Sequence, residues 1–191
     1  MRKVMYGMSI SLDGYIEDAK GSLSWHIIDD ELHSHFNRLE SLVDMHLYGR
    51  QLYELMAAYW PEADKNPAAQ QVEVEYAEIW RNKPKVVFSS TLKQVEWNSR
   101  LVSGGAGEEV RRLKEQPGNY LSVGGAQLAS SLTRLGLVDE FWLYYQPVVL
   151  GSGKPMFQFL PEAVRLELID SQRFGSGVVL LKYRAAGDER R

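Results

Sequence analysis

Two adjacent glycines, Gly124 and Gly125, separate an apolar run from a helical pattern in the segment "YLSVGGAQLASSLTRLG". No acidic side chain occurs from Gly124 to Arg134, so the positive end of the helix dipole and the first-turn amides are left for an outside anion. Glycine also lets such an anion approach the backbone closely. The pair is equally typical of a plain tight turn, and on this segment alone both interpretations stay open.

A second strand-to-helix junction, "VSGGAGEEV", also contains adjacent glycines but differs in charge. Its helix begins with Glu108 and Glu109, whose carboxylates already complement the dipole and would repel a bound anion. In open α/β sheets, ligands bind at the carboxyl ends of the strands. The junction at Gly124 and Gly125 is therefore the better candidate for an anion site.

Two more junctions carry groups that bind phosphate. The segment "LYGRQLYE" places Arg50 directly after Gly49 at a helix start, where a cation opposes the dipole unless an anion joins it. The segment "VFSST" ends a strand with the hydroxyls of Ser89, Ser90 and Thr91. A surface arginine and a turn-capping serine are the ordinary alternatives. Together the three junctions favour a dinucleotide with an additional phosphate.

The common phosphate-binding signatures are absent. No G-x-G-x-x-G follows the first predicted strand, so the Rossmann fingerprint is missing. The run "GSGK" at 151–154 resembles a Walker sequence only superficially, because Pro155 stands where Ser or Thr is required. A dinucleotide site in this chain must therefore be built differently.

Strands and helices alternate through the first two-thirds of the chain, and the last third is rich in strands. Predicted strands cover residues 3–12, 44–49, 85–90, 99–104, 120–123, 138–151, 164–174 and 177–185. Predicted helices cover residues 29–42, 50–60, 67–82, 106–116 and 126–136. The last two strands are expected to form a hairpin. This order predicts an α/β fold, a mostly parallel sheet with an antiparallel C-terminal edge.

One predicted strand is aromatic on both faces. Alternation sends Trp142 and Tyr144 one way and Phe141 and Tyr145 the other. We expect both faces to be buried, by the core or by a second subunit.

Composition sets the class of protein. The 191 residues are 45% hydrophobic and 25% charged, which predicts one domain over residues 1–185 with a frayed tail at 186–191. A net charge of −3 and the lack of an apolar run of ~20 residues give no sign of nucleic-acid or membrane binding. The N-terminus is too quickly polar for a signal peptide, and we expect a cytoplasmic protein.

Cysteine is absent, which excludes disulfides, thiolate nucleophiles and Cys-ligated zinc. His33 and His35 are two residues apart and would face different ways on a helix. No metal site is expected.

Several segments, taken in order, resemble one superfamily. They are "MSISLDGYI", a Trp followed by an acid-led helix, "YGRQLYE", "VFSST", "SVGGAQLASSL" and "QPVVLGSGKPMF". They resemble the dihydrofolate reductase-like superfamily, and more closely the reductase domain of bacterial riboflavin biosynthesis and its stand-alone relatives. The resemblance covers nearly the full length. It implies a three-layer α/β/α domain around an eight-stranded sheet, NADPH bound across the strand ends, and a homodimer.

The resemblance also implies roles for individual residues. In the family the Gly-Gly pair contacts the pyrophosphate, often through a cis peptide, and the first strand lines the nicotinamide. The arginine after the strand-end glycine and the next strand's hydroxyls lie toward the adenosine 2′-phosphate. The cofactor residues implied here are Ser9, Ile16, Gly49, Arg50, Ser89, Ser90, Thr91, Gly124, Gly125, Ala126, Gln127 and Leu128.

On the substrate side, Trp25 and Asp30 have the spacing with which classical dihydrofolate reductases place a pterin-orienting carboxylate. The alternative is that Asp29, Asp30 and Glu31 only cap the following helix. No arginine matches the one that binds the folate glutamate tail.

The riboflavin-type branch implies that Gly151, Gly153 and Lys154 lie near the substrate or its phosphate. A glycine-rich loop leading into a packed Phe157 is the alternative. The zinc deaminase that often accompanies this reductase is not expected, because its cysteine ligands are missing.

The expected activity is an NADPH-dependent reduction of a heterocyclic or ribosylamino-pyrimidine-like small molecule, similar to 5-amino-6-(5-phosphoribosylamino)uracil reductase. Asp30, or a bound water, would aid proton delivery. A true dihydrofolate reductase is the rival enzyme. A non-catalytic, dimeric nucleotide-binding module is the rival of another class.

Overall fold

Eight strands form the central sheet in the computed structural model, which describes residues 1–158 and 160–186. The spatial order is β5-β4-β3-β6-β1-β7-β10-β9. The strands are β1 (Lys3–Ile10), β3 (Val43–Gly49), β4 (Lys85–Phe88), β5 (Ser99–Val102), β6 (Tyr120–Gly124), β7 (Glu140–Tyr145), β9 (Leu166–Arg173) and β10 (Val179–Ala185). Neighbours from β5 to β7 are parallel, and β10 is antiparallel to both β7 and β9. The predicted mostly parallel sheet and its antiparallel C-terminal edge are confirmed.

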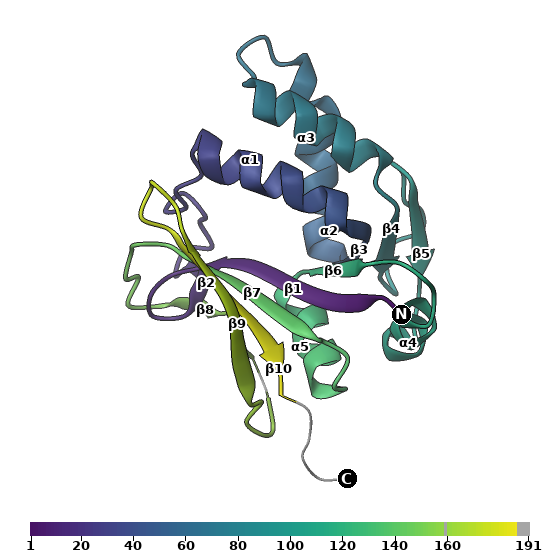
Figure 1. Cartoon of the computed structure of the whole chain (residues 1–191). Helices are drawn as coiled ribbons and strands as arrows, with labels where there is room; N and C mark the ends of the chain where they lie inside the picture. Colours follow the sequence, from purple (N-terminus) through teal and green to yellow (C-terminus); the bar gives the residue numbers. More distant parts are fainter. Residues whose placement is uncertain (159, 187–191) are drawn as a thin grey trace.

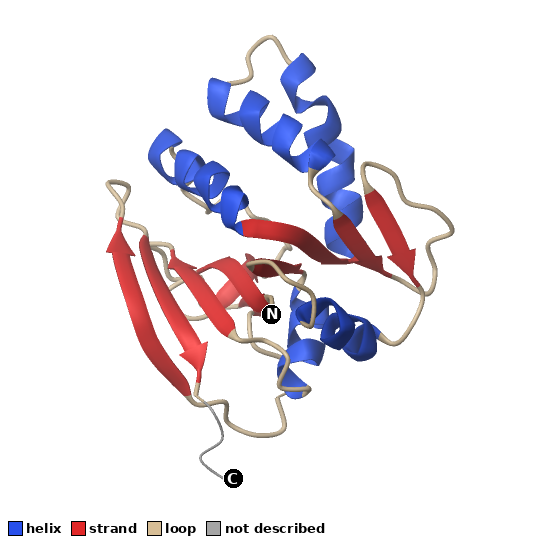
Figure 2. Cartoon of the chain, turned by 45° about the vertical axis from the view of Figure 1, so that its right-hand side comes forward, coloured by secondary structure: helices blue, strands red, loops and turns tan. Residues whose placement is uncertain are grey.

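Helices cover both faces of the sheet (Figures 1 and 2). One layer contains α1 (Asp30–Leu39), α2 (Arg50–Tyr59) and α3 (Gln71–Asn82). The other contains α4 (Ala106–Lys114) and α5 (Ala126–Arg134). The three-layer α/β/α arrangement is therefore confirmed. Within the described residues, no helix is long and apolar enough to cross a membrane.

The aromatic strand β7 is buried on both faces, as alternation predicts. Phe141 is 1% exposed and packs in the cluster beneath α4 and α5. Trp142 and Tyr144 are 4% and 3% exposed and pack with Leu32 of α1. Burial of these three rings helps to pack a helix layer against each face of the sheet.

Two short strands lie outside the predicted set. Strand β2 (Tyr15–Asp18) pairs antiparallel with β8 (Gly153–Pro155) in a separate two-stranded sheet. A Cβ on Gly153 would collide with the carbonyl of Glu17, so this pairing requires glycine there. The predicted strand over 138–151 ends at Tyr145 because the chain then turns toward β8.

The C-terminal end of the described chain is tied to the loop before β9. The amide of Ala186 donates to the carbonyl of Arg165 at 2.9 Å. The rest of the predicted frayed tail, residues 187–191, lies outside the described residues.

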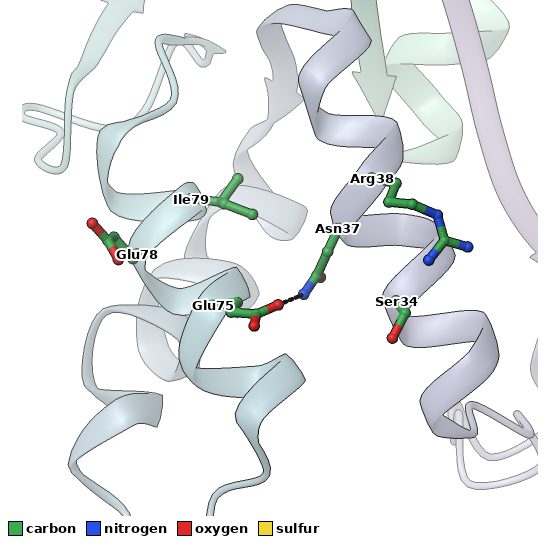
Figure 3. A pocket seen from close by; sticks show the side chains of 6 residues that line it. All are labelled: Ser34, Asn37, Arg38, Glu75, Glu78 and Ile79. Carbon is green, nitrogen blue, oxygen red and sulfur yellow. Dashed lines mark hydrogen bonds between the residues drawn. The ribbon is translucent and has the colours of Figure 1, made fainter.

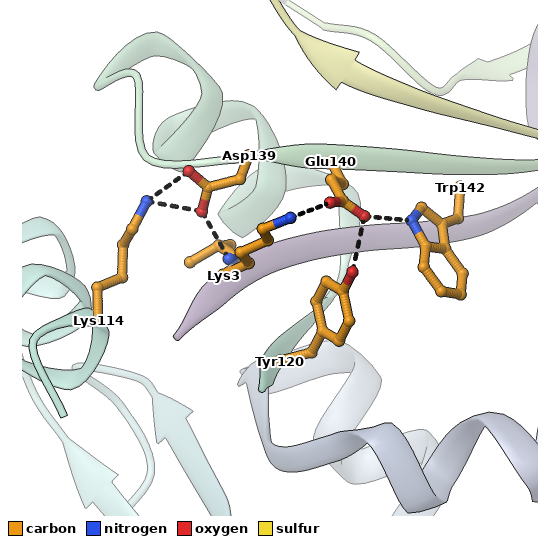
Figure 4. Close-up of polar contacts among 7 residues, drawn as sticks. Lys3, Lys114, Tyr120, Asp139, Glu140 and Trp142 are labelled. Carbon is orange, nitrogen blue, oxygen red and sulfur yellow. Dashed lines mark hydrogen bonds and ion pairs between the residues drawn. The ribbon is translucent and has the colours of Figure 1, made fainter. Parts of the chain in front are cut away.

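Polar contacts join the amino ends of β1, β6 and β7 (Figure 4). The carboxylate of Glu140 is 2.9 Å from Lys3 Nζ, 3.1 Å from the Tyr120 hydroxyl and 3.0 Å from Trp142 Nε1. All three donors converge on one side chain that is 2% exposed. A buried carboxylate with this many partners stabilises the start of the sheet.

Candidate functional site

The helix starts of α2 and α5 lie side by side. Their strands β3 and β6 are neighbours, with Tyr48 in register with Gly124. Gly49 is the N-cap of α2 and Gly125 the N-cap of α5, and a Cβ built on Gly125 would lie 3.8 Å from the Gly49 nitrogen. Neither helix has a side-chain cap or an acidic residue in its first turn. Two sets of first-turn amides therefore face the same place with no carboxylate of their own.

The two glycines of the pair are needed for different reasons. Gly124 is buried, and a Cβ there would collide with Leu52 and lie 2.7 Å from a ring carbon of Tyr48. Packing of α2 against β6 thus explains Gly124 without a ligand. Gly125 has φ 99° and ψ 122°, and nothing lies closer than 3.8 Å to the position that a methyl group would take there. A methyl group would therefore fit in ordinary contact, and it is the positive φ that favours glycine at this position.

The described residues contain no cis peptide bond, so the peptide between Gly124 and Gly125 is trans.

Arg50 is the first residue of α2 and lies beside this paired helix start. Its side chain is 45% exposed, and Nη1 is 3.0 Å from Glu54 Oε2 one turn later. An exposed pair of this kind is worth little free energy. Arg50 can therefore turn to an incoming anion at small cost.

The hydroxyl turn follows β4, which pairs with β3 so that Phe88 is in register with Gly49. Ser89 Oγ accepts hydrogen bonds from the amides of Thr91 at 3.2 Å and Leu92 at 3.1 Å. The turn-capping alternative therefore describes Ser89. Ser90 and Thr91 are exposed beyond it. The ends of β6, β3 and β4 are thus consecutive along one edge of the sheet.

The first turn of α5 offers mainly backbone. Ala126 and Leu128 are 5% and 9% exposed and belong to the core, whereas the side chain of Gln127 is exposed. This turn can therefore present its backbone amides and the Gln127 side chain to a ligand.

The end of β1 is joined to the loop before α1 by a residue that sequence reasoning missed. Gln146 is fully buried, and its Oε1 accepts the amide of Ile27 at 2.9 Å. Its Nε2 lies 3.5 Å from Ser9 Oγ, and its own amide donates to the carbonyl of Ile10 at 2.8 Å. Gln146 opens the segment "QPVVLGSGKPMF", whose resemblance gives this residue no role, so only the contacts reveal it. Ile16, on β2, is a core residue at 5% exposure.

The three acidic residues at the start of α1 differ in their contacts. Asp29 Oδ1 accepts the amide of Leu32 at 2.9 Å and is the N-cap. Glu31 Oε2 accepts the amide of Gly175 at 2.8 Å, which joins α1 to the hairpin between β9 and β10. Asp30 is exposed and makes no hydrogen bond or ion pair with the described residues. Helix capping therefore leaves the Asp30 carboxylate available.

The loop before α1 holds Trp25 by local contacts. Its Nε1 donates to the carbonyl of Ser22 at 3.0 Å, and its ring meets that of His26 edge-on at 4.1 Å. Burial lowers the pKa of His26, so this imidazole is neutral near pH 7.

The glycine-rich loop before β8 is bound to the turn after β1. Asp13 accepts the amides of Leu150 at 3.1 Å and Gly151 at 2.7 Å. Lys154 Nζ pairs with Glu17 Oε1 at 2.8 Å. This loop therefore lies beside the carboxyl ends of β1 and β7.

A hollow of about 470 Å³ lies between α1 and α3, away from the carboxyl ends of the strands (Figure 3). Asn37 Nδ2 donates to Glu75 Oε2 at 3.3 Å within it. The lining residues are Ser34, Asn37, Arg38, Glu75, Glu78 and Ile79. Two carboxylates make this hollow unsuitable for a polyanionic dinucleotide.

Comparison with known proteins adds a family and a fold. Residues 2–180 match the family model described as the RibD C-terminal domain. An uncharacterised protein of Bacillus subtilis (strain 168), YyaP, is 34% identical over 187 residues, which cover 97% of this chain and 96% of the relative.

Solved structures share the fold at low sequence identity. A putative riboflavin biosynthesis protein from Shewanella sp. PV-4 has a TM-score of 0.76 at 23% identity, covering 96% of this chain and 99% of that one. The diaminohydroxyphosphoribosylaminopyrimidine deaminase/5-amino-6-(5-phosphoribosylamino)uracil reductase from Thermotoga maritima has a TM-score of 0.64 at 16% identity, covering 97% and 57%. Dihydrofolate reductase from Enterococcus faecalis, complexed with NADP(H), has a TM-score of 0.63 at 14% identity, covering 97% of each chain.

Proposed function

This chain belongs to the RibD C-terminal domain family, and from that premise we propose that it is an NADPH-dependent reductase acting on a small heterocyclic molecule. The family match covers residues 2–180, nearly the whole chain. The likeness to a dihydrofolate reductase complexed with NADP(H) supports the same reaction class through the fold.

One observation carries the proposal. Two uncapped helix starts, at Gly49 and Gly125, face one place at the carboxyl edge of a parallel sheet. Gly125, with its positive φ and no side chain, suits a diphosphate that contacts the backbone. Arg50 and the exposed hydroxyls of Ser90 and Thr91 follow at the next two strand ends and suit the additional 2′-phosphate. The residues present therefore fit NADPH.

The cofactor would supply the hydride, and the chain would supply orientation. The first-turn amides of α2 and α5 would fix the diphosphate. Ser9, at the end of β1, would line the nicotinamide, and the buried Gln146 would hold Ser9 and the loop before α1 in a fixed relation. Trp25 and the glycine-rich loop would border the substrate.

The unpaired carboxylate of Asp30 is the group proposed for proton delivery. It stands at the start of α1 and has no partner among the described residues, while Asp29 and Glu31 are both engaged. An exposed carboxylate can orient a water or a substrate N–H group. The same feature favours the second candidate, a true dihydrofolate reductase, in which this carboxylate would bind the pterin.

The test is a titration of the protein with NADPH and with NADH, followed by fluorescence. The proposal expects tighter binding of NADPH, and NADPH-dependent reduction of a heterocyclic substrate in a panel of candidates. Binding of neither dinucleotide would refute the proposal. Binding without reduction of any substrate would favour a non-catalytic module. Tight, NADPH-enhanced binding of methotrexate-like antifolates would instead favour dihydrofolate reduction.

A further inference from the structure

The connection between the parallel strands β4 and β5, residues 89–98, contains neither helix nor strand. Such a connection usually contains an α-helix, whose packing on the sheet fixes the course of the chain. Here side-chain contacts must do so. The connection begins with Ser89, Ser90 and Thr91, of which the last two are exposed and proposed for the 2′-phosphate. The contacts that hold the connection therefore determine where these hydroxyls lie.

Tyr53 of α2 makes two hydrogen bonds with the backbone of this connection. Its hydroxyl accepts the amide of Glu96 at 2.8 Å and donates to the carbonyl of the same residue at 3.3 Å. Tyr53 is 6% exposed, and its ring belongs to a buried cluster against which Leu92 and Val95 pack. Tyr53 and its cluster thus hold three residues of the connection.

The end of the connection has a backbone conformation that needs such support. Trp97 and Asn98 have φ 58° and 52°, in the left-handed region that favours glycine. Residues of this kind persist only where the surrounding contacts fix them. Lys85 Nζ donates to the carbonyl of Trp97 at 2.7 Å from the side of β4. Tyr53 fixes the preceding residue, Glu96, from the side of α2.

Tyr53 also stands on the same helix as Arg50, three residues after it. Because a helix is a rigid element, the residue that holds the connection has a fixed position relative to the cation proposed for the 2′-phosphate. Ser90 and Thr91 lie on the connection that Tyr53 holds. The hydroxyl of Tyr53 therefore links the two sides of the proposed 2′-phosphate site.

We propose that Tyr53 is a positioning residue for cofactor specificity, which holds Ser90 and Thr91 beside Arg50 and so favours NADPH over NADH. This inference rests on the proposed reductase function. Tyr53 acts through the connection rather than by touching the cofactor, since its hydroxyl is already engaged by Glu96. Loss of this hydroxyl should change the ratio of the two affinities, because only NADPH carries the additional phosphate.

The first experiment removes the hydroxyl and keeps the ring in its cluster. In Tyr53→Phe, fluorescence titrations should show the ratio of NADPH affinity to NADH affinity falling by about threefold or more. Trypsin should also cleave after the exposed Lys93 faster than in the parent protein. An unchanged ratio, an unchanged cleavage rate, or equal losses of affinity for both dinucleotides would overturn the proposal.

Tyr120→Phe is the matched control for this experiment. It removes a hydroxyl that donates to Glu140 at 3.1 Å, at the amino end of β6. At temperatures where the variant is folded, it should change neither the affinity ratio nor cleavage after Lys93. The same changes in both variants would attribute them to lost stability and overturn the role of Tyr53.

The second experiment tests whether Tyr53 acts through the hydroxyls. In a protein that already carries Ser90→Ala and Thr91→Ala, Tyr53→Phe should produce no further change in the affinity ratio, because the groups that it positions are gone. A further fall of the same size would show that Tyr53 does not act through these hydroxyls and would overturn the proposal. Failure of the proposed function would appear earlier, as absence of dinucleotide binding by the parent protein.

Discussion

The polar groups at the two ends of the central sheet differ in whether they have partners within the chain. At the amino ends, Glu140 binds Lys3 and two other donors, and Asp139 binds Lys114 Nζ at 2.7 Å and the amide of Val4 at 2.7 Å. At the start of β3, Glu40 is 3.1 Å from His46 Nε2 and 3.6 Å from Lys83 Nζ. Charges at this end have partners within the chain.

At the carboxyl ends of β3 and β6, the first-turn amides of the following helices have no side-chain partner. The first turns of α2 and α5 have no side-chain cap, and Arg50 has only an exposed pair with Glu54. In folded proteins, a side chain next to the helix start usually accepts a hydrogen bond from such first-turn amides. The difference shows that the charges at the amino ends stabilise the fold, and it supports the proposal that the starts of α2 and α5 bind a ligand.

A buried titratable group is not by itself a sign of function. Lys85 is 2% exposed, and burial lowers its pKa to about 8. Its Nζ donates to the carbonyls of Lys83 and Trp97, both at 2.7 Å, and lies 4.3 Å from the Trp80 ring centre. Because every contact is structural and the group stands at the start of β4, we assign Lys85 to the stabilising end.

The largest expected effect is on stability at the amino ends. Glu140→Ala leaves the buried Trp142 Nε1 without its acceptor and removes the counter-charge of Lys3. We expect the free energy of unfolding to fall by about 3 kcal/mol, with NADPH affinity unchanged at temperatures where the variant is folded. Urea unfolding and NADPH titration measure the two quantities. A large loss of NADPH affinity in the folded variant would contradict the claim that the amino ends affect only stability.

Low pH should also destabilise the amino ends of the sheet. Burial alone would raise the pKa of Glu40, but His46 and Lys83 outweigh it and hold that pKa below its ordinary value. For Glu140, burial is likewise outweighed by the hydrogen bonds from Lys3 and Trp142, which lower the pKa. A lowered carboxylate pKa gives stability that is present above the unfolded value, about 4.3, and is lost as pH falls through the folded value.

Unfolding free energy should therefore decline as pH is lowered below about 4.3. Glu140→Gln should make this decline shallower, since one of the carboxylates with a lowered pKa no longer titrates. Urea unfolding at a series of pH values measures it. An identical slope in the variant and the parent would show that Glu140 does not contribute to acid sensitivity.

At the carboxyl ends, Arg50→Ala should affect binding with little effect on stability. We expect NADPH affinity to fall by about tenfold, a loss of about 1.4 kcal/mol, and NADH affinity to change much less. Lys93→Ala, an exposed cation two residues after Thr91, is a control for general charge. Equal losses of affinity for NADPH and NADH would show that Arg50 does not bind the 2′-phosphate.

A smaller effect is expected at the substrate side. Gln146→Ala frees the loop held through Ile27, and trypsin should then cleave after the exposed Lys20 about threefold faster. Unchanged cleavage in Gln146→Ala would show that Gln146 does not position this loop.

Most of the fold could be predicted because its strands and helices carry strong periodic patterns. The exceptions are informative. Strands β2 and β8 have four and three residues and pair only with each other, outside the main sheet. Their pairing depends on a close backbone approach at Gly153 that only the folded chain reveals.

The candidate site could be predicted as a set of junctions but not in its details. Charge patterns locate the strand ends that meet. They cannot show that Gly124 is required by Leu52 and Tyr48, or that Lys154 is bound by Glu17, because these partners are distant in sequence or in another element. Gln146 lies in a family-like segment, but its role depends on contacts with Ile27 and Ser9 that the sequence does not show.

The most direct test of the central claim compares two glycine variants by NADPH titration. Gly125 and Gly105 are both helix N-caps with positive φ, 99° and 65°, so alanine should strain each by about 1–3 kcal/mol. The α4 start after Gly105 already has Glu108 and Glu109 in its first turn, whereas α5 has no acid there. Gly125→Ala should weaken NADPH binding by about a hundredfold, through loss of close backbone contact. Gly105→Ala should leave it within about twofold. Parent-like NADPH affinity in Gly125→Ala, or equal losses in both variants, would contradict the account.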